Sequence, residues 1–398
     1  MYSACEIQSY LSEHVDELMQ SRHHLHRHPE IGLELPETAE FIKSKLRDFG
    51  VDEIHTGFGS TAVVAVIHGN QKGDRWVGLR ADMDALPLNE QTGLDYASVN
   101  EKKAHSCGHD GHMTVALGAC HFLSAHRDFP GSVAVIFQPG EEGYAGARLM
   151  VQNGLFEKFP IAEIYATHCE PTLDVGQIGL DEGYIMAAAD IFSIDVTGRG
   201  GHGARPQTAV DSVLVASQIV VSAQSIVSRN VNPLQAAVVS FGAIVSGDVN
   251  GSSVLPQTAK LVGTCRSFEP EIQDRVQKRL GEIAEGVAQA YGARAQCHYT
   301  RLYPALLNHP KQTSAVKEIV RHWLGEEGLK SAPQQMTAED FAFMTQVRPG
   351  CLFRLGVRDG SHRANLHECE FDFNDKAIVY GSTLMSLIAV NRLAAING

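Results

Sequence analysis

The segment Val133-Ala-Val-Ile-Phe137-Gln138-Pro-Gly-Glu141-Glu142-Gly143 joins a short apolar run to a glycine turn that carries two carboxylates. The apolar run predicts a β-strand, and the proline and glycines predict a turn directly after it. We therefore expect a strand that ends at a pair of adjacent acids.

Similar apolar runs alternate with helical patterns over the first half of the chain. This alternation predicts an α/β layer with a mixed, largely parallel sheet. An amphipathic helix from Ile7 to Leu25 and a second helix from Pro36 to Gly50 should precede it. The further strands expected are Thr61–Ile67, Trp76–Leu79 and Ile164–Thr167, and the further helices are 111–126 and 144–152.

The order of predicted strands and helices changes near Ala189. Two strand–helix–strand pieces follow, and their order is that of a ferredoxin-like α+β domain. We expect this domain at residues 188–299, inserted into a catalytic domain made of residues 1–187 and 300–398. Its strands are predicted at Ile191–Val196, Ala237–Val245 and Lys260–Phe268 and its helices at 208–228 and 270–291, and a final helix at 374–396 should close the catalytic domain.

Composition restricts the class of protein. The chain has 398 residues, of which 44% are hydrophobic and 20% charged, as in a globular protein of two domains. Its net charge of −13 disfavours nucleic acid as a partner. We see no apolar run of membrane-spanning length and no signal peptide, so we expect no membrane association and a cytoplasmic location. The eight scattered cysteines do not indicate a disulfide framework.

The densest cluster of chemically active residues is His105-Ser-Cys-Gly-His-Asp-Gly-His112, directly before a predicted helix. Cys107 and His109, two residues apart across a glycine, can converge on one metal ion. The alternative is a polar loop with a buried thiol and helix-capping groups. The motif by itself leaves both interpretations open.

Further candidates stand beside predicted strands and loops. Glu141 and Glu142 could divide two tasks, because one could take a proton and the other could bind metal, although a solvated acidic turn would look the same. His168 follows a strand, and His367 lies in a loop. Asp82 closes the strand that begins at Trp76.

Loops at the carboxyl ends of strands meet at one edge of an α/β sheet. Five of these residues could therefore converge there as metal ligands, which is more than one tetrahedral ion needs. Two divalent metal ions fit this set better. The expected ligands are Cys107, His109, Glu142, His168 and His367.

The sequence resembles the amidohydrolase branch of the aminoacylase and carboxypeptidase superfamily, which includes hippurate hydrolases, bacterial aminoacylases and plant auxin-conjugate hydrolases. The resemblance covers nearly the whole chain and keeps the family order. The matching blocks are His26-Arg-His-Pro-Glu30, Gly78-Leu-Arg-Ala-Asp-Met-Asp-Ala-Leu-Pro87, His105-Ser-Cys-Gly-His-Asp-Gly-His112, Phe137-Gln-Pro-Gly-Glu-Glu-Gly143, Gly198-Arg-Gly-Gly-His-Gly203, Ala338-Glu-Asp-Phe341 and Phe371-Asp-Phe-Asn-Asp375.

This resemblance implies a zinc-peptidase-like catalytic domain with a lid that often also mediates dimerisation, so a homo-oligomer (dimer or tetramer) is expected. It implies that Cys107 is shared by two metal ions, that Glu141 is the general base, and that Asp82 orients a ligand. The implied reaction is hydrolysis of the amide bond of N-acyl amino acids of the hippurate, N-acetyl or auxin-conjugate type. The implied metals are Zn, Mn, Co or Ni, among which these ligands do not discriminate.

The segment Gly198-Arg-Gly-Gly-His-Gly203 also fits a dinucleotide-binding pattern. That reading needs an acidic residue about 20 positions later, and none occurs between Ser212 and Gly247. The family resemblance instead places His202 on the lid, where it would reach the scissile carbonyl oxygen. A glycine turn with an incidental histidine is the alternative.

The chain departs from its relatives at several positions. Cys169-Glu170 stands where Asn-Trp is usual, Gln207 where histidine is frequent, and Glu368-Cys369-Glu370 where a proline-containing segment is common. The added carboxylates predict a preference against acidic substrates. A dipeptidase or carboxypeptidase, which would recognise a free α-amine, and a non-catalytic metal-dependent binding protein remain as alternatives.

Overall fold

The computed structural model describes residues 2–398 and divides the chain into two compact units. The larger unit contains the chain as far as Gly183, together with 307–333 and 340–398. The smaller unit contains 184–306 and the short segment 334–339. That segment is held by the N–H of Ala187, which donates to the carbonyl oxygens of Gln335 and Thr337.

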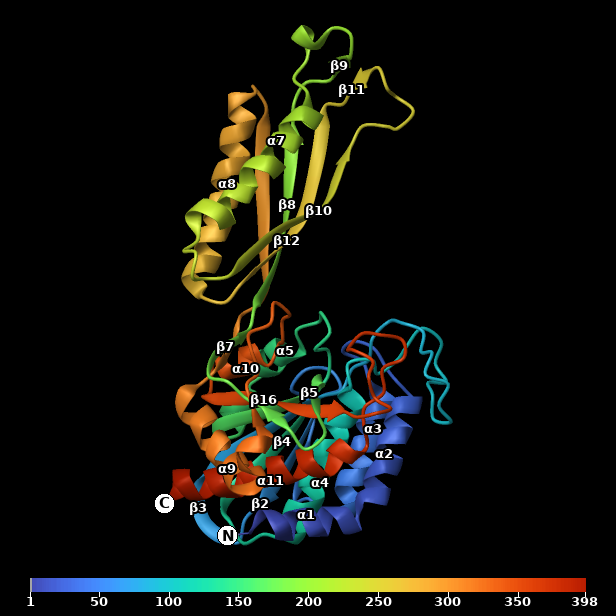
Figure 1. Cartoon of the computed structure of the whole chain (residues 1–398), viewed down its shortest axis with the longest axis vertical. Coiled ribbons are helices and arrows are strands. Elements are labelled where there is room, and N and C mark those ends of the chain that lie inside the picture. The colour runs from blue at the N-terminus through green and yellow to red at the C-terminus, as the bar shows by residue number, and fades with distance from the viewer. Residues whose placement is uncertain (1) are drawn as a thin grey trace. The chain divides into compact units, whose positions relative to one another are not determined.

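The larger unit is built on an eight-stranded mixed sheet with the order β1-β2-β4-β3-β5-β16-β6-β15 (Figure 1). Its four central strands, β4, β3, β5 and β16, are mutually parallel, which confirms the predicted α/β fold with a largely parallel sheet. The strands are β1 Glu53–His55, β2 Val63–His68, β3 Gln71–Asp82, β4 Pro130–Gln138, β5 Ile161–Asp174, β6 Ile178–Gly179, β15 Leu329–Lys330 and β16 Gly350–Arg358.

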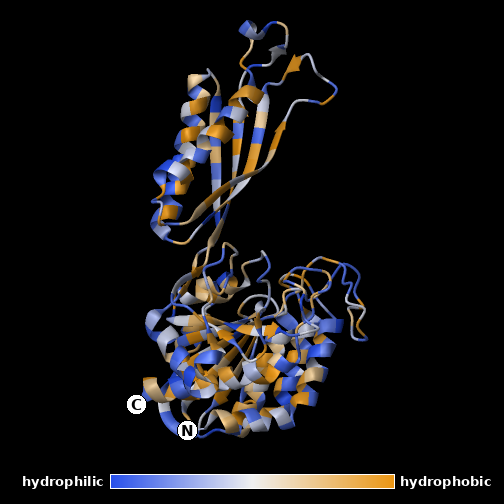
Figure 2. Ribbon diagram, in the orientation of Figure 1, coloured by the Kyte–Doolittle hydropathy of each residue, from blue (hydrophilic) through white to orange (hydrophobic). Residues whose placement is uncertain are grey.

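Alternate residues of the central strands form one core with the surrounding helices. Leu79 of β3 and Val135 of β4 belong to one buried hydrophobic cluster with side chains of α4 and α11. Figure 2 shows hydrophobic colouring in the central strands of this unit and in the helices next to them. The residues between them, such as Arg80 and Ile136, are buried as well. Burial on both faces is typical of parallel strands, and it explains why these segments read as continuous apolar runs.

The helices predicted for the larger unit occur in the predicted order, with one correction. Three more, at 155–158, 310–328 and 342–345, were not predicted. We expected a single opening helix, but it is broken at His14, whose φ of −107° and ψ of 9° are not helical. Ser3 and Glu6 form a capping box at its start. The helices are α1 Ala4–Glu13, α2 Val15–Arg27, α3 Pro36–Asp48, α4 His109–Ala125, α5 Gly146–Gln152, α6 Leu155–Lys158, α9 Pro310–Gly328, α10 Ala342–Thr345 and α11 Lys376–Asn397.

Two helices are long and apolar enough to cross a membrane by length and composition alone, Ser212–Asn230 and Lys376–Asn397. Neither helix was expected from the sequence as a candidate membrane span. In the second, 78% of the apolar window is buried inside the protein. Its hydropathy is therefore accounted for by the core of the larger unit.

The smaller unit is an antiparallel sheet with the order β10-β12-β8-β13 and two helices. The chain order β8-α7-β10-β12-α8-β13 is that of a ferredoxin-like fold. Asp211 caps α7 through the N–H groups of Val213 and Leu214. The elements are β8 Ala188–Thr197, α7 Ser212–Ser225, the π-helical turn Ile226–Asn230, β10 Ala237–Ser246, β12 Thr258–Ser267, α8 Pro270–Ala290 and β13 Arg294–Tyr303, with one short pair, β9 Gly201–His202 and β11 Val254–Leu255. A second short pair, β7 Gly183–Met186 with β14 Leu306–Asn308, includes the residues at which the chain passes from one unit to the other.

Candidate metal centre

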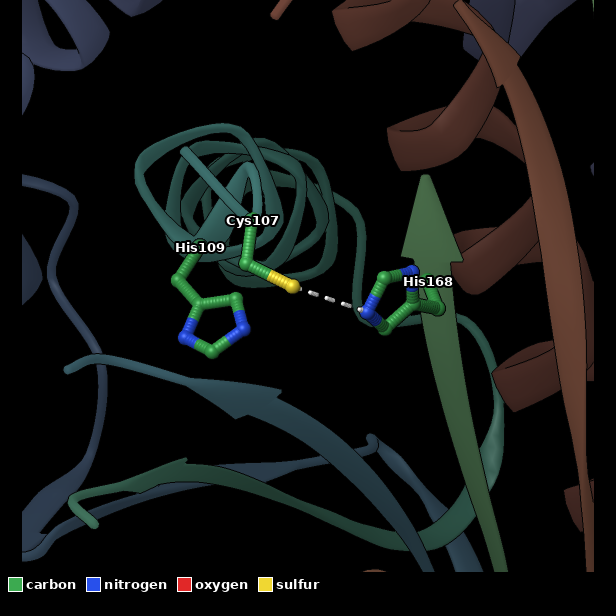
Figure 3. A group of neighbouring side chains, drawn as sticks. All are labelled: Cys107, His109 and His168. Carbon is green, nitrogen blue, oxygen red and sulfur yellow. Dashed lines mark hydrogen bonds between the residues drawn. The ribbon is translucent and has the colours of Figure 1, made fainter. Parts of the chain in front are cut away.

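A glycine turn at the start of α4 places Cys107 and His109 side by side. Gly108 has a φ of +79°, and a Cβ atom there would lie 2.5 Å from Cys169 Sγ. Both the backbone conformation and the lack of space therefore require glycine. Figure 3 shows Cys107 and His109 at the start of α4, and it shows His168 approaching Cys107 from β5.

Cys107, His109 and His168 form a first group of candidate ligands. Their ligand atoms all lie within 4.8 Å of one another, and Cys107 Sγ is 3.5 Å from His168 Nε2. Nδ1 of His168 donates to the carbonyl oxygen of Cys169 at 2.8 Å, so Nε2 keeps its lone pair for a ligand. His168 lies inside β5, which continues to Asp174, and not at the strand end that the sequence suggested.

Cys107, Glu142 and His367 form a second group within the same 4.8 Å limit. Glu142 Oε1 lies 3.4 Å from His367 Nε2. The two groups share the Cys107 sulfur. The structure thus brings together all five residues that the sequence analysis named as ligands, in two sets of three.

His367 has an unusual backbone. Its φ is +66°, a conformation that non-glycine residues seldom adopt. The N–H of His367 donates to the carbonyl oxygen of Ser106 at 2.7 Å, which ties its loop to the residue before Cys107. Such local strain is held in place by the surrounding structure and is common at functional sites.

Asp84 fixes the acidic turn after β4, a role that the sequence analysis missed. Its two carboxylate oxygens accept hydrogen bonds from the N–H groups of Glu141 at 2.9 Å and Glu142 at 3.0 Å. The N–H of Asp340 lies 3.4 Å from Glu141 Oε1. Asp84 lies beyond the end of β3, which finishes at Asp82, so strand alternation does not reveal its role.

Asp82 lies against His112, a residue that the sequence analysis quoted without assigning a role. Asp82 Oδ1 is 2.6 Å from His112 Nδ1, and Asp82 Oδ2 accepts from Arg80. His112 Nε2 accepts the N–H of Cys169 at 2.8 Å. Both ring nitrogens of His112 are occupied, so it is not available to a metal although it lies in a cluster with Asp82 and His109.

The charges and unpaired atoms of the site fit a bound cation. Both ring nitrogens of His109 are buried without a hydrogen-bond partner among residues 2–398. Burial would lower the pKa of His109, but Asp82, Asp84 and Glu142 raise it to about 10. Carboxylates that stabilise a proton in this way would also stabilise a divalent ion. Burial and Glu142 raise the pKa of Cys107 well above its ordinary value, so its thiolate would need a cation beside it.

A network of charged side chains links α2 to the segments that follow His109 and His367 in the chain. Arg22 pairs with Asp372 at 2.7 Å, Asp375 at 2.8 Å and Asp110 at 3.4 Å. His26, four residues later on α2, hydrogen-bonds Asp110 at 2.8 Å. His26 stands in the first of the family blocks, and the sequence alone assigned it no role.

His202 belongs to the smaller unit, where it pairs with Val254 between β9 and β11. Its Nδ1 accepts the N–H of Ala204 at 3.0 Å, which leaves Nε2 to carry the ring proton. The side chain is exposed. Its exposed Nε2–H can act as a hydrogen-bond donor.

Comparisons with known proteins agree with this architecture. The profile of Peptidase family M20/M25/M40 matches residues 78–391. The chain belongs to this family.

Similar proteins include the hippurate hydrolase of Campylobacter jejuni, which is 36% identical over 94% of this chain and 95% of that protein. The N-acetyl-L-cysteine deacetylase of Bacillus subtilis is 36% identical over 92% of this chain and 86% of its own length. Among solved structures, the chain superposes on the YxeP protein of B. subtilis, a dinuclear metal binding peptidase of the M20 family, with a TM-score of 0.84. The two are 31% identical, and the match covers 96% of this chain and 98% of YxeP. The chain is an enzyme of this hydrolase family.

The structure shows what surrounds the residues by which this M20 chain departs from its relatives. Arg354 lies 3.6 Å from Glu170 and offsets its charge. Glu368 accepts hydrogen bonds from the backbone and side-chain N–H groups of Asn365, so it caps its own loop. Glu370 is exposed. The expected excess of negative charge is therefore smaller than the sequence suggested.

Proposed function

We propose that this chain is a metal-dependent amidohydrolase that splits the amide bond of N-acyl amino acids and releases a carboxylic acid and a free amino acid. The observation that carries the proposal is the pair of three-ligand groups that share Cys107, with Glu141 held beside them by Asp84. The similarity to a hippurate hydrolase and an N-acetyl-L-cysteine deacetylase supports this substrate class.

We propose Cys107, His109, Glu142, His168 and His367 as the ligands of two divalent ions. The similarity to a dinuclear relative supports the number two, and Zn, Mn, Co and Ni all suit these ligands. Ions held there would lower the pKa of a water molecule and polarise the amide carbonyl.

The side chains of this chain would then perform the proton transfers. Glu141, whose backbone is fixed by Asp84, takes a proton from the attacking water and passes it to the leaving amine. His202 donates its Nε2 proton in a hydrogen bond to the oxyanion, which contributes on the order of 3 kcal/mol in comparable sites. Asp82 fixes the position of His112 and, through the N–H of Cys169, the strand that carries His168.

The domain roles are also part of the proposal. The inserted unit would serve as a lid that excludes water and delivers His202. It would also form the interface of a homo-oligomer (dimer or tetramer), because β10 is an edge strand and apolar side chains are exposed beside it. These exposed side chains include Val213, Leu214 and Val221 of α7 and Ile244 and Val245 of β10. Sedimentation equilibrium on the wild type and on a Val221→Asp variant tests this interface.

A cytoplasmic location is proposed as well. All eight cysteines are free, and free thiols suit a reducing compartment. A thiol titration of enzyme taken directly from cells would show eight reactive groups after unfolding.

The test of the function is a release assay on enzyme stripped by a chelator and reloaded with Zn, Mn, Co or Ni. The panel holds N-acetyl, N-benzoyl and indole-acetyl amino acids, together with plain dipeptides. Metal-dependent release from the acylated compounds is the expected result. Cleavage of dipeptides alone would instead identify a dipeptidase or carboxypeptidase, and no cleavage by the metal-loaded protein would favour a binding protein.

A further inference from the structure

His14, Glu17 and His121 form a separate cluster of metal-ligating side chains, and none of them is among the five candidate ligands. Their ligand atoms all lie within 4.8 Å of one another. The imidazole rings of His14 and His121 have centroids 4.4 Å apart. Nothing in the proposed reaction uses these residues.

The packing of α2 on α4 brings the cluster together. A Cβ atom at Gly118 would lie 3.2 Å from Leu18 Cδ1, so the two helices approach closely at this point. Glu17 precedes Leu18 on α2, and His121 lies one turn after Gly118 on α4. The break between α1 and α2 at His14 places a second imidazole beside them.

His121 is arranged as a metal ligand would be. Its Nδ1 lies 2.9 Å from the hydroxyl oxygen of Tyr10, and its Nε2 lies 4.0 Å from Glu17 Oε2. When Nδ1–H donates to Tyr10, the lone pair of Nε2 points at the carboxylate. Ligating histidines almost always use their other nitrogen in such a hydrogen bond.

The other two ligands can adjust around an ion. The ring of His14 is half-buried and contacts the rings of Tyr10 and His121. Glu17 is 41% exposed, so its side chain can move. Ligand atoms around a tetrahedral zinc ion lie about 3.3 Å apart, so the three side chains must shift by roughly an ångström.

We propose that His14, Glu17 and His121 form a third metal site, which takes one Zn²⁺-class divalent ion and links α2 to α4. Two imidazoles and one carboxylate are a ligand set that zinc accepts, with water in the fourth position. Lys45 Nζ lies 3.1 Å from the other carboxylate oxygen of Glu17 and weakens the site by its charge.

The test is a count of bound zinc. Metal-free enzyme is dialysed against buffered free Zn²⁺, and zinc per chain is measured by mass spectrometry. The double variant Glu17→Gln/His121→Gln should bind one zinc fewer than the wild type, and its N-acyl hydrolysis should be unchanged. The matched control, Glu318→Gln/His322→Gln on α9, removes an exposed pair of the same kind and should bind as many ions as the wild type.

The difference of one ion does not depend on how many ions the proposed catalytic centre holds. An equal count in the wild type and in Glu17→Gln/His121→Gln would overturn the third site, whatever the activity. Lys45→Gln offers an independent test in an intact site. Removal of this half-buried cation should tighten zinc binding at the proposed third site by roughly two- to fivefold. Unchanged or weaker binding would contradict the proposal.

Discussion

Asp82 Oδ1 lies 2.6 Å from His112 Nδ1, and neither side chain reaches solvent. The carboxylate accepts a hydrogen bond from Nδ1–H. This fixes the ring with Nε2 as the acceptor for the N–H of Cys169. Three segments are joined in this way: the end of β3, the first turn of α4 and the strand that carries His168. The sequence predicts that Asp82 orients a ligand, and in the structure its hydrogen bonds are made to His112 and Arg80.

Asp82→Asn should destabilise the metal-free enzyme by about 3–5 kcal/mol, because it leaves the buried charge of Arg80 with less compensation. Metal affinity should also fall by roughly 10- to 100-fold, since His112 and β5 lose their support. Urea unfolding and metal titration measure the two effects. Asp274→Asn, in an exposed ion pair with Arg301, is the control and should cost less than about 1 kcal/mol. Equal losses in both variants would contradict this role of Asp82.

The pattern of the sequence was sufficient for the elements that depend on local periodicity. The strand at Val133–Phe137 and the helix from Pro36 were predicted because an apolar run and a favoured first-turn proline mark them locally. The break at His14 was not predicted, because Leu11 and Leu18 continue one apolar face across it.

For the site, the sequence identified side chains that carry chemistry but not those that hold them. Cys107, His109 and Glu142 are conspicuous because of their residue types. Asp84 was missed because its effect, a clamp on two backbone N–H groups, depends on a contact 57 residues away in sequence. Arg22 was missed for the same reason, because its partners Asp372 and Asp375 lie near the other end of the chain.

The charge of His26 should make stability depend on pH. Burial would lower its pKa, but hydrogen bonds and attraction to Asp110 and Glu90 raise the pKa to about 9. A raised pKa contributes stability that is complete below the unfolded value near 6.5 and is lost as pH rises toward 9.

The contribution of His26 is on the order of 3 kcal/mol. The free energy of unfolding of the metal-free wild type should therefore fall between pH 6.5 and 9 more steeply than that of His26→Gln. Urea titrations at several pH values measure the difference. Parallel curves for the two proteins would show that His26 is not charged in the folded state.

The backbone of His367, a proposed metal ligand, should be strained. Glycine adopts a φ of +66° without cost, whereas other residues lose about 1 kcal/mol or more in this region. Metal-free His367→Gly should therefore be more stable than metal-free His367→Ala by about 1 kcal/mol, although both should bind metal less tightly than the wild type. Chemical unfolding and metal titration compare them. A less stable glycine variant would argue against strain at this position.

Gly108→Ala should disrupt the metal centre, because its Cβ atom would lie 2.5 Å from Cys169 Sγ at a φ of +79°. We expect a loss of bound metal and of roughly 2 kcal/mol or more of stability. The double variant Gly108→Ala/Cys169→Ala removes the clash but not the strain, so it should recover part of the loss. Bound metal and melting temperature provide the comparison. No recovery in the double variant would show that the contact with Cys169 is not the cause.

The most direct test of the central claim is a single preparation of Glu141→Gln, in which bound metal and turnover of an N-acyl amino acid are both measured. We predict that the variant keeps the metal content of the wild type and loses activity by roughly 10²- to 10⁴-fold, as expected when a general base is removed. Loss of metal from this variant, or turnover close to that of the wild type, would contradict the division of tasks between Glu141 and Glu142.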